Sequence, residues 1–202
     1  MNREWVDGKL ETLALELRGF DVASRASHLF FFEPTDDVYK KLESGDEGDL
    51  QRVASRIAAH VGIISVPTVR YDWGLKMEPE VAGQIRSDSR VAYVQIPFFY
   101  VGRRYSLGGI LAHEVTHQLL YSRHISLEDP NENEFFTDLT AVFVGLGKLL
   151  LNGALDQGGR LGYLSPDLIA YSLKKMCHVH TIDIEIALEN LTGEARPLVE
   201  HA

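Results

Sequence analysis

The spacing of apolar residues predicts an amphipathic helix that begins near Leu50. In the segment LQRVASRIAAHVG, the apolar side chains of Leu50, Val53, Ile57 and Val61 fall three or four residues apart, which is the period of one helix face. Gly62 follows the last of these positions and predicts the end of the helix.

Two segments after this helix alternate in the manner of strands. PTVRYDW, at 67–73, alternates polar and apolar side chains, and RVAYVQI, at 90–96, is a second candidate that Pro97 ends. The pattern therefore predicts a helix followed by a small sheet.

The next predicted helix runs from Leu107 to about Tyr121, with Ser106 as its N-cap. Its apolar residues lie on nearly all sides, which is typical of a helix buried in the middle of a fold. Gly108 and Gly109 weaken its first turn by about 1 kcal/mol each relative to alanine. We therefore expect another part of the chain to pack closely against these glycines.

A second long, mostly buried helix is predicted shortly afterwards. Asp129 is placed as its N-cap, Pro130 as its first helical residue and Glu132 as the partner of Asp129 in a capping box. Asn152 and Gly153 predict its end.

A further helix is predicted in the C-terminal part, with Ser165 as N-cap and Pro166 at its first position. The predicted class is α+β, dominated by helices. The 202 residues suffice for a single domain. We expect N-terminal helices and a small sheet to about residue 105, the two central helices over about 106–153, and a mainly helical part over about 154–202.

The composition is that of an acidic globular protein. Charged residues make up 24% of the chain and hydrophobic residues 45%, which argues against a disordered or fibrous protein. The formal net charge is −9. Nucleic-acid binding requires clustered Lys and Arg, so we expect no nucleic-acid partner.

Cysteine content and hydropathy suggest a compartment. Cys177 is the only cysteine, which excludes an internal disulfide and a four-thiolate zinc site and favours a reducing compartment. The N-terminal residues lack the apolar core of a secretory signal. The most apolar run, Leu139–Leu151, is too short to span a bilayer and contains Lys148. We therefore expect a cytoplasmic protein with no membrane partner.

The segment LAHEVTHQLL carries the candidate chemistry. His113 and His117 are four residues apart, so on a helix their imidazoles lie on one face and can converge on one metal ion. Glu114 lies about 100° further round the helix, beside the ligand face. A carboxylate in that place can take a proton from a water molecule that a metal ion activates.

A catalytic zinc site needs a third protein ligand, and the next predicted helix offers Glu134 in its first turns. Asp138 lies four residues further on the same face and can support a ligand histidine through its second ring nitrogen. Glu132 is the rival third ligand, although it is expected in the capping box and has no carboxylate four residues on.

These residues resemble those of a known family. HEVTH at 113–117 matches the HExxH motif, and NEFFTD at 133–138 is similar to the NExxSD signature of thermolysin-like zinc metallopeptidases, the gluzincins. The resemblance implies that one zinc ion is held by His113, His117 and Glu134, that Glu114 is the general base, and that Asp138 supports a ligand histidine.

The resemblance covers about 30 residues, 108–138, and Thr137 stands where the family has serine. It implies a zincin-like fold, in which a small, mostly antiparallel sheet packs on a buried active-site helix. It also implies that the strand RVAYVQI is a sheet edge along which an extended peptide can lie.

Weaker candidates remain open. A gluzincin also uses a group that stabilises the oxyanion, and the chain offers Tyr121, His124, Tyr163 and Tyr171 without a means of choosing. The segment MCHVHTID at 176–183 clusters a cysteine with two histidines, but its spacing fits no familiar zinc pattern and favours a structural role.

Three functions follow from these patterns. The first is a zinc peptidase acting on a peptide or protein substrate through a metal-activated water molecule. The second is a gluzincin-fold protein that binds a partner without turnover, since 202 residues are few for a broad-specificity protease. The third is a regulatory protease that cuts one cytoplasmic protein. The patterns indicate neither the substrate nor the oligomeric state.

Overall fold

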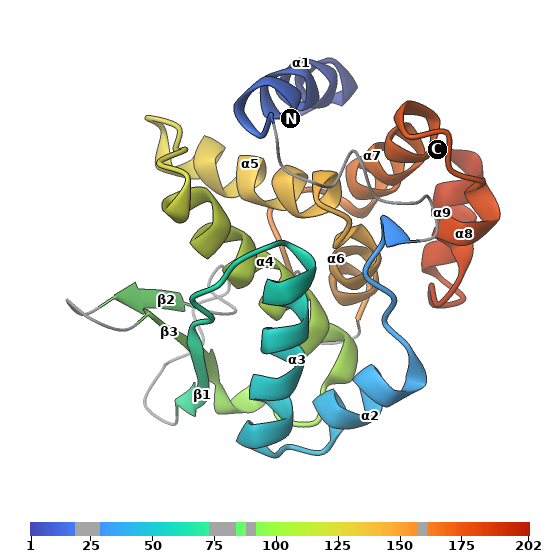
Figure 1. Ribbon diagram of the computed structural model, residues 1–202. Coiled ribbons are helices and arrows are strands. Elements are labelled where there is room, and N and C mark those ends of the chain that lie inside the picture. The colour runs from blue at the N-terminus through green and yellow to red at the C-terminus, as the bar shows by residue number, and fades with distance from the viewer. Residues whose placement is uncertain (19–28, 73–83, 88–91, 157–160) are drawn as a thin grey trace.

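A computed structural model describes residues 1–18, 29–72, 84–87, 92–156 and 161–202 (Figure 1). Its elements, in chain order, are α1 (Arg3–Glu16), α2 (Asp36–Glu43), α3 (Glu47–His60), β1 (Thr68–Asp72), β2 (Gln84–Ser87), β3 (Ala92–Pro97), the 3-10 turn η2 (Phe98–Tyr100), α4 (Arg104–Ser122), α5 (Pro130–Phe143), α6 (Gly147–Ala154), α7 (Pro166–Val179), α8 (Ile184–Leu188) and α9 (Ala195–His201). The expected α+β class, dominated by helices, is confirmed.

Helix α4 is the central element of the fold. It packs against α2, α3, α5 and α6 and also contacts β2, and Figure 1 shows it in the middle of the fold. The predicted burial is confirmed, because its side chains are buried on nearly all sides. The expected close packing at Gly108 is also found: a Cβ on this residue would lie 3.0 Å from Leu149 Cδ2 of α6.

The sheet differs from the expected arrangement. Its strand order is β1-β3-β2; β3 pairs with β2 in antiparallel and with β1 in parallel orientation. The expectation of a mostly antiparallel sheet was therefore wrong, because the sheet is mixed. Parallel neighbours need a long connection, and residues 73–91, which include β2, supply it between β1 and β3.

The segment RVAYVQI was wrongly expected to be a sheet edge. Its residues from Ala92 onward form β3, which is the central strand and is paired on both sides. The edges of this sheet are β1 and β2, so β3 has no free edge on which a peptide could lie.

One long helix was expected over residues 130–153, but the structure has two, α5 and α6. Helix α5 ends at Phe143 with Val144 as its C-cap, and Gly145 has φ +89, which an L residue with a side chain rarely adopts. A Cβ on Gly145 would lie 2.1 Å from the carbonyl oxygen of Phe30. The break therefore lets the chain segment around Phe30 approach, and Phe32 donates its amide to the Gly145 carbonyl at 2.9 Å.

The helix starts were predicted with mixed success. Asp129 caps α5 as expected, accepting the Glu132 amide at 2.9 Å, and Ser165 precedes Pro166 at the start of α7. Ser106 was wrongly expected to cap α4, which begins two residues earlier, at Arg104. The Ser106 hydroxyl instead donates to a carboxylate of the chain after α6, Asp156 Oδ2, at 2.6 Å.

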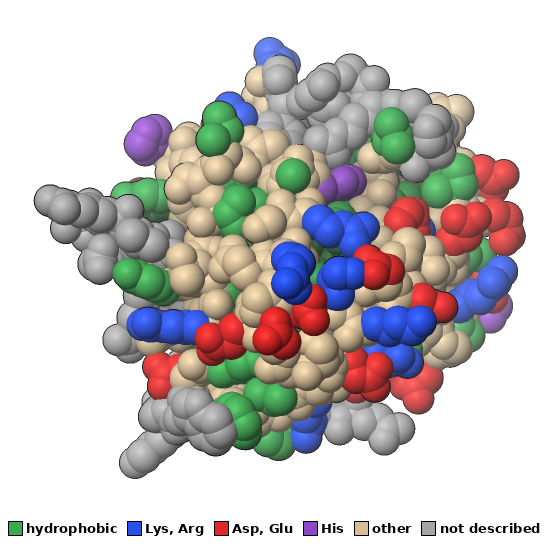
Figure 2. Space-filling model, turned by 60° about the horizontal axis from the view of Figure 1, so that its bottom comes forward, with side chains coloured by type: hydrophobic (Ala, Val, Ile, Leu, Met, Phe, Trp, Pro, Cys, Tyr) green, Lys and Arg blue, Asp and Glu red, His purple; other side chains and the backbone are tan. Residues whose placement is uncertain are grey.

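The surface over α2 and α3 mixes charges of both signs. Figure 2 shows Lys and Arg side chains interspersed with Asp and Glu on this face. Arg56 pairs with Asp37, and Arg104 of α4 reaches Glu43. Among the described residues, every helix falls short of the length and apolarity needed to cross a membrane.

Candidate metal centre

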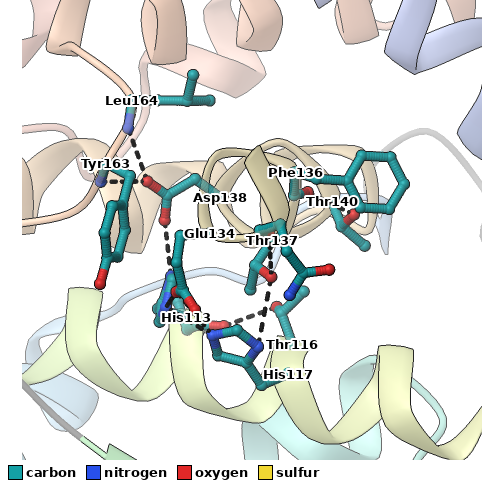
Figure 3. Close-up of polar contacts among 12 residues, drawn as sticks. His113, Thr116, His117, Glu134, Phe136, Thr137, Asp138, Thr140, Tyr163 and Leu164 are labelled. Carbon is teal, nitrogen blue, oxygen red and sulfur yellow. Dashed lines mark hydrogen bonds and ion pairs between the residues drawn. The ribbon is translucent and has the colours of Figure 1, made fainter. Parts of the chain in front are cut away.

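Three side chains from α4 and α5 meet at one point. His113 and His117 lie one turn apart on α4, and their Nε2 atoms are 2.9 Å from each other. Oε2 of Glu134, in the second turn of α5, lies 3.0 Å from each of these nitrogens. Figure 3 shows the three groups pointing toward one another between the two helices. The fold thus brings together the three residues predicted as metal ligands.

The tautomer of His113 follows from the contact of its other ring nitrogen, Nδ1, with Asp138. Its Nδ1 lies 2.8 Å from Oδ1 of Asp138, which is fully buried. An ionised carboxylate can only accept hydrogen bonds, so Nδ1 of His113 carries the proton and donates. In the neutral ring, Nε2 therefore presents a lone pair to His117 and Glu134.

The Thr137 hydroxyl lies near the second ring nitrogen, Nδ1, of His117. This hydroxyl donates to the carbonyl of Asn133 at 2.9 Å, which leaves only its oxygen lone pairs for other partners. Nδ1 of His117 lies 3.4 Å from this oxygen and is the atom that can donate to it, although the contact is long. With its proton on Nδ1, His117 also directs an Nε2 lone pair to the point between the helices.

When both rings are neutral with their protons on Nδ1, three acceptors face one another. Two imidazole lone pairs and a carboxylate oxygen at 2.9–3.0 Å repel unless a positive charge lies between them. Two imidazole nitrogens and one carboxylate oxygen are the donor set of common catalytic zinc sites. Within the described part of the chain, His113, His117 and Glu134 form the one such group that could hold a metal ion.

Protonation can also supply the positive charge that these three atoms favour. Burial acts to lower the pKa of His113, but hydrogen bonds with Asp138 and Glu134 outweigh it and raise the pKa to about 10. Burial acts to raise the pKa of Glu134, but hydrogen bonds from His113 and His117 lower it to about 2. The anionic surroundings therefore favour a cation at this point, whether a proton or a metal ion.

Glu114 accompanies this group on α4. It directly follows His113, is only 4% exposed, and its charge helps to raise the pKa of His113. Burying a carboxylate costs free energy unless a positive charge or a hydrogen bond compensates it. A cation bound between His113, His117 and Glu134 would help to compensate the charge of Glu114. The role of Glu114 as a base stays a prediction.

The structure separates Glu134 from its rival Glu132. The Glu132 carboxylate extends to α1, where it accepts from Trp5 Nε1 at 3.1 Å and pairs with Lys9 at 3.0 Å. It therefore ties α5 to α1 instead of reaching back to Asp129 in a full capping box.

A loop that sequence reasoning missed completes the surroundings of His113. Oδ2 of Asp138 accepts the backbone amides of Tyr163 and Leu164 at 2.6 and 2.8 Å, and the Tyr163 ring stacks on His113 with centroids 5.6 Å apart. Tyr163 was one of four open candidates, but its backbone role had no signal in the sequence. Gly162, just before it, has φ +86, and a glycine at this place is a sequence signal of such a turn.

The other three candidates for stabilising an oxyanion have no described contact with His113, His117 or Glu134. Tyr171 donates its hydroxyl to Asp7 of α1 at 3.0 Å. Tyr121, one turn after His117, is exposed, and His124 follows α4 in an exposed turn with φ 57. Of the four, Tyr163 alone has a described contact with a member of the metal-binding group.

The cluster near Cys177 forms no metal group among the residues that the structure describes. Cys177 is buried and His178 is exposed, while the ring of His180 lies 4.4 Å from that of Phe30. The structural role favoured for this segment is consistent with these positions.

Comparison with known proteins adds no further identification: no protein-family model, no curated protein and no solved structure matches this chain.

Proposed function

We propose that this protein is a zinc-dependent metallopeptidase of the gluzincin type. The observation that carries the proposal is the convergence of three acceptor atoms, from His113, His117 and Glu134, within 3.0 Å of one another. Three protein ligands are the number found in catalytic zinc sites, where a water molecule or substrate takes the fourth position. Glu114 and Asp138 occupy the places that the HExxH and NExxSD-like motifs assign to a base and a supporting carboxylate.

A bound zinc ion would polarise a scissile carbonyl and bring the pKa of a water molecule to about 7. In this proposal, Glu114 takes the proton of the attacking water and delivers it to the leaving amine. Asp138 keeps the proton of His113 on Nδ1, so that Nε2 stays available as a ligand. The proposed substrate is a peptide or a protein, in which one peptide bond is hydrolysed.

The metal part is tested with two neighbouring carboxylates on α5. Protein purified without added zinc is analysed for metal in the wild type, in Glu134→Gln and in the matched control Glu132→Gln. We expect near-stoichiometric metal in the wild type and the control, and its loss in Glu134→Gln, since only Glu134 contacts the histidines. Equal metal content in Glu134→Gln and wild type would contradict the assignment.

The peptidase part is tested with Glu114→Gln, which keeps the size of the side chain and removes the base. We expect zinc content to stay at the wild-type level while cleavage of a peptide library falls by about 10²-fold or more. A zinc-loaded wild type that cleaves nothing across a broad set of peptides and proteins would contradict the proposal. A variant as active as wild type would remove Glu114 from the role of base.

A further inference from the structure

We propose that residues 162–164, called here the 162–164 loop, are a positioning element of the metal centre that fixes the orientation of His113. The inference rests on the metal site of the proposed function and adds to it a segment outside both motifs. The loop acts on His113 by two routes. One runs through the Asp138 carboxylate, and the other through the ring of Tyr163.

The first route is a backbone cradle for Asp138. One carboxylate oxygen, Oδ2, accepts the amides of Tyr163 and Leu164 at 2.6 and 2.8 Å, while the other, Oδ1, faces His113 Nδ1 at 2.8 Å. A fully buried carboxylate is costly unless it accepts such hydrogen bonds. The two amides also leave Oδ1 free to accept from the imidazole, so the loop fixes the direction of the hydrogen bond that orients His113.

Gly162 makes this cradle possible. Its φ is +86, and a Cβ at this position would lie 3.2 Å from Oδ2 of Asp138. A side chain would strain the backbone and crowd the carboxylate that the two following amides bind. Glycine thus serves both the conformation of the turn and its close approach to the carboxylate.

The second route is the stacked ring. Tyr163 lies against the face of His113 with an interplanar angle of 26° and a centroid distance of 5.6 Å. Figure 3 shows the Tyr163 ring beside His113, while its backbone nitrogen points to Asp138. The imidazole therefore has its Nδ1 edge fixed by Asp138 and one face fixed by Tyr163, which leaves Nε2 aimed at Glu134 and His117.

A coupling between loop and metal follows. If the loop orients a ligand, a metal ion bound to that ligand must in return stabilise the loop, because linked binding equilibria are reciprocal. Metal affinity and the order of the 162–164 loop should therefore change together.

The main test compares two glycines with the same backbone strain. Gly162→Ala and the control Gly102→Ala both place alanine at positive φ, +86 and +77, but the nearest atom to a Cβ at Gly102 is Glu43 O, at 3.8 Å. Zinc affinity is measured by competition with a chromophoric chelator. Loss of a supporting contact around a metal ligand typically weakens binding by about 10–100-fold, and we expect this for Gly162→Ala alone. Equal affinities for the two variants would overturn the inference.

A second pair of variants leaves the backbone intact in case Gly162→Ala fails to fold. Tyr163→Phe keeps the ring and Tyr163→Ala removes it. With Co²⁺ in place of zinc, the visible absorption bands report ligand geometry. We expect wild-type bands in Tyr163→Phe and shifted or weakened bands in Tyr163→Ala. Unchanged bands in Tyr163→Ala would remove the ring from the proposed element.

Hydrogen exchange tests the coupling in the wild-type protein. Peptides that contain the amides of Tyr163 and Leu164 should exchange more slowly with zinc than without it. Exchange that is equal in both states would overturn the coupling. If the wild type binds no zinc at all, the proposed function itself fails, whereas wild-type binding with unaffected variants refutes only the role of the loop.

Discussion

Gly109 of α4 and Gly153 of α6 touch through their backbones: a Cβ on Gly153 would lie 2.9 Å from Gly109 Cα, and one on Gly109 would lie 3.2 Å from Gly153 Cα. Because both residues are glycine, the two helix backbones meet directly at this crossing. Gly109 lies one turn before His113, so the crossing fixes where the metal-binding turn of α4 lies in the core. The glycines let the two helices approach closely, as was predicted from Gly108 and Gly109 in the first turn of the helix.

We therefore expect Gly153→Ala to push α6 away from α4. Its Cβ would also lie 2.9 Å from the backbone oxygen of Tyr105, which cannot move like the end of a side chain. Overpacking of this kind costs about 1–3 kcal/mol, measurable by urea unfolding. The control Gly193→Ala, where a Cβ meets nothing within 4 Å, should stay within about 0.5 kcal/mol of wild type. Similar losses in both variants would contradict close packing as the cause.

Gly145 and Gly8 should respond to alanine in opposite directions. At Gly145 the φ of +89 and the Phe30 carbonyl 2.1 Å from a Cβ predict a loss of more than about 3 kcal/mol or failure to fold. Gly8 lies inside α1 with open space around it, so alanine should stabilise the protein by about 0.5–1 kcal/mol. Thermal unfolding of both variants checks the two signs, and a stable Gly145→Ala would contradict the turn described here.

Lys148 is a buried cation whose replacement should be costly. Its ammonium contacts both oxygens of Glu33 at 2.7 and 2.9 Å and is fully buried. Breaking a buried pair costs about 3–5 kcal/mol; because the Glu33 side chain is 29% exposed, we expect about 2–4 kcal/mol for Lys148→Met.

Two further variants check the Lys148 result by urea unfolding. Lys175→Met breaks a more exposed pair with Asp7 and should cost at most about 1 kcal/mol. Glu33→Gln combined with Lys148→Met should recover part of the loss, since it removes the carboxylate left without its cation. A loss in Lys148→Met no larger than that in Lys175→Met would show that burial adds nothing to this pair.

Cys177 should make the stability fall at alkaline pH. Burial raises the pKa of this thiol from 9.0 to about 11. Between these values the unfolded chain loses the thiol proton while the folded chain keeps it, so unfolding is favoured as pH rises. Stability from this group is complete below about pH 9 and is lost by about 2–3 kcal/mol as the pH passes about 11.

The measurement compares the wild type with Cys177→Ala. Urea unfolding free energies are determined at a series of pH values from about 8 to about 11, and the difference between the two proteins should change in that interval. Tyr71, whose pKa burial raises to about 12, titrates in both proteins and cancels in the comparison. A difference that does not vary with pH would contradict a buried, neutral thiol.

The residues of the metal-binding group could be predicted because they lie on two helices with local spacing rules. The four-residue spacing of His113 and His117 fixes one face, and the same spacing links Glu134 to Asp138. The sequence alone left Glu132 as an alternative to Glu134, since both lie near the start of α5. In the structure, Trp5 and Lys9 of α1 bind the Glu132 carboxylate. Glu132 therefore points away from the two histidines.

Features that depend on distant contacts could not be predicted in the same way. The parallel pairing of β1 with β3 follows from a path of 19 intervening residues, 73–91, that no local pattern encodes. The end of α5 depends on the carbonyl of Phe30 beside Gly145. The amides of Tyr163 and Leu164 carry no side-chain signature, so their contact with Asp138 could be found only in three dimensions.

The cradle of Asp138 has a consequence for the order in which the protein is made. The two amides that hold this carboxylate come 25 and 26 residues after it in the chain. During synthesis, both metal-binding helices therefore emerge before the segment that orients His113. A nascent chain ending between α5 and Leu164 would have its three ligands and Asp138, but not the two amides that hold the Asp138 carboxylate. Full affinity for metal should therefore develop late in synthesis, after the chain beyond α6 has folded back onto α5.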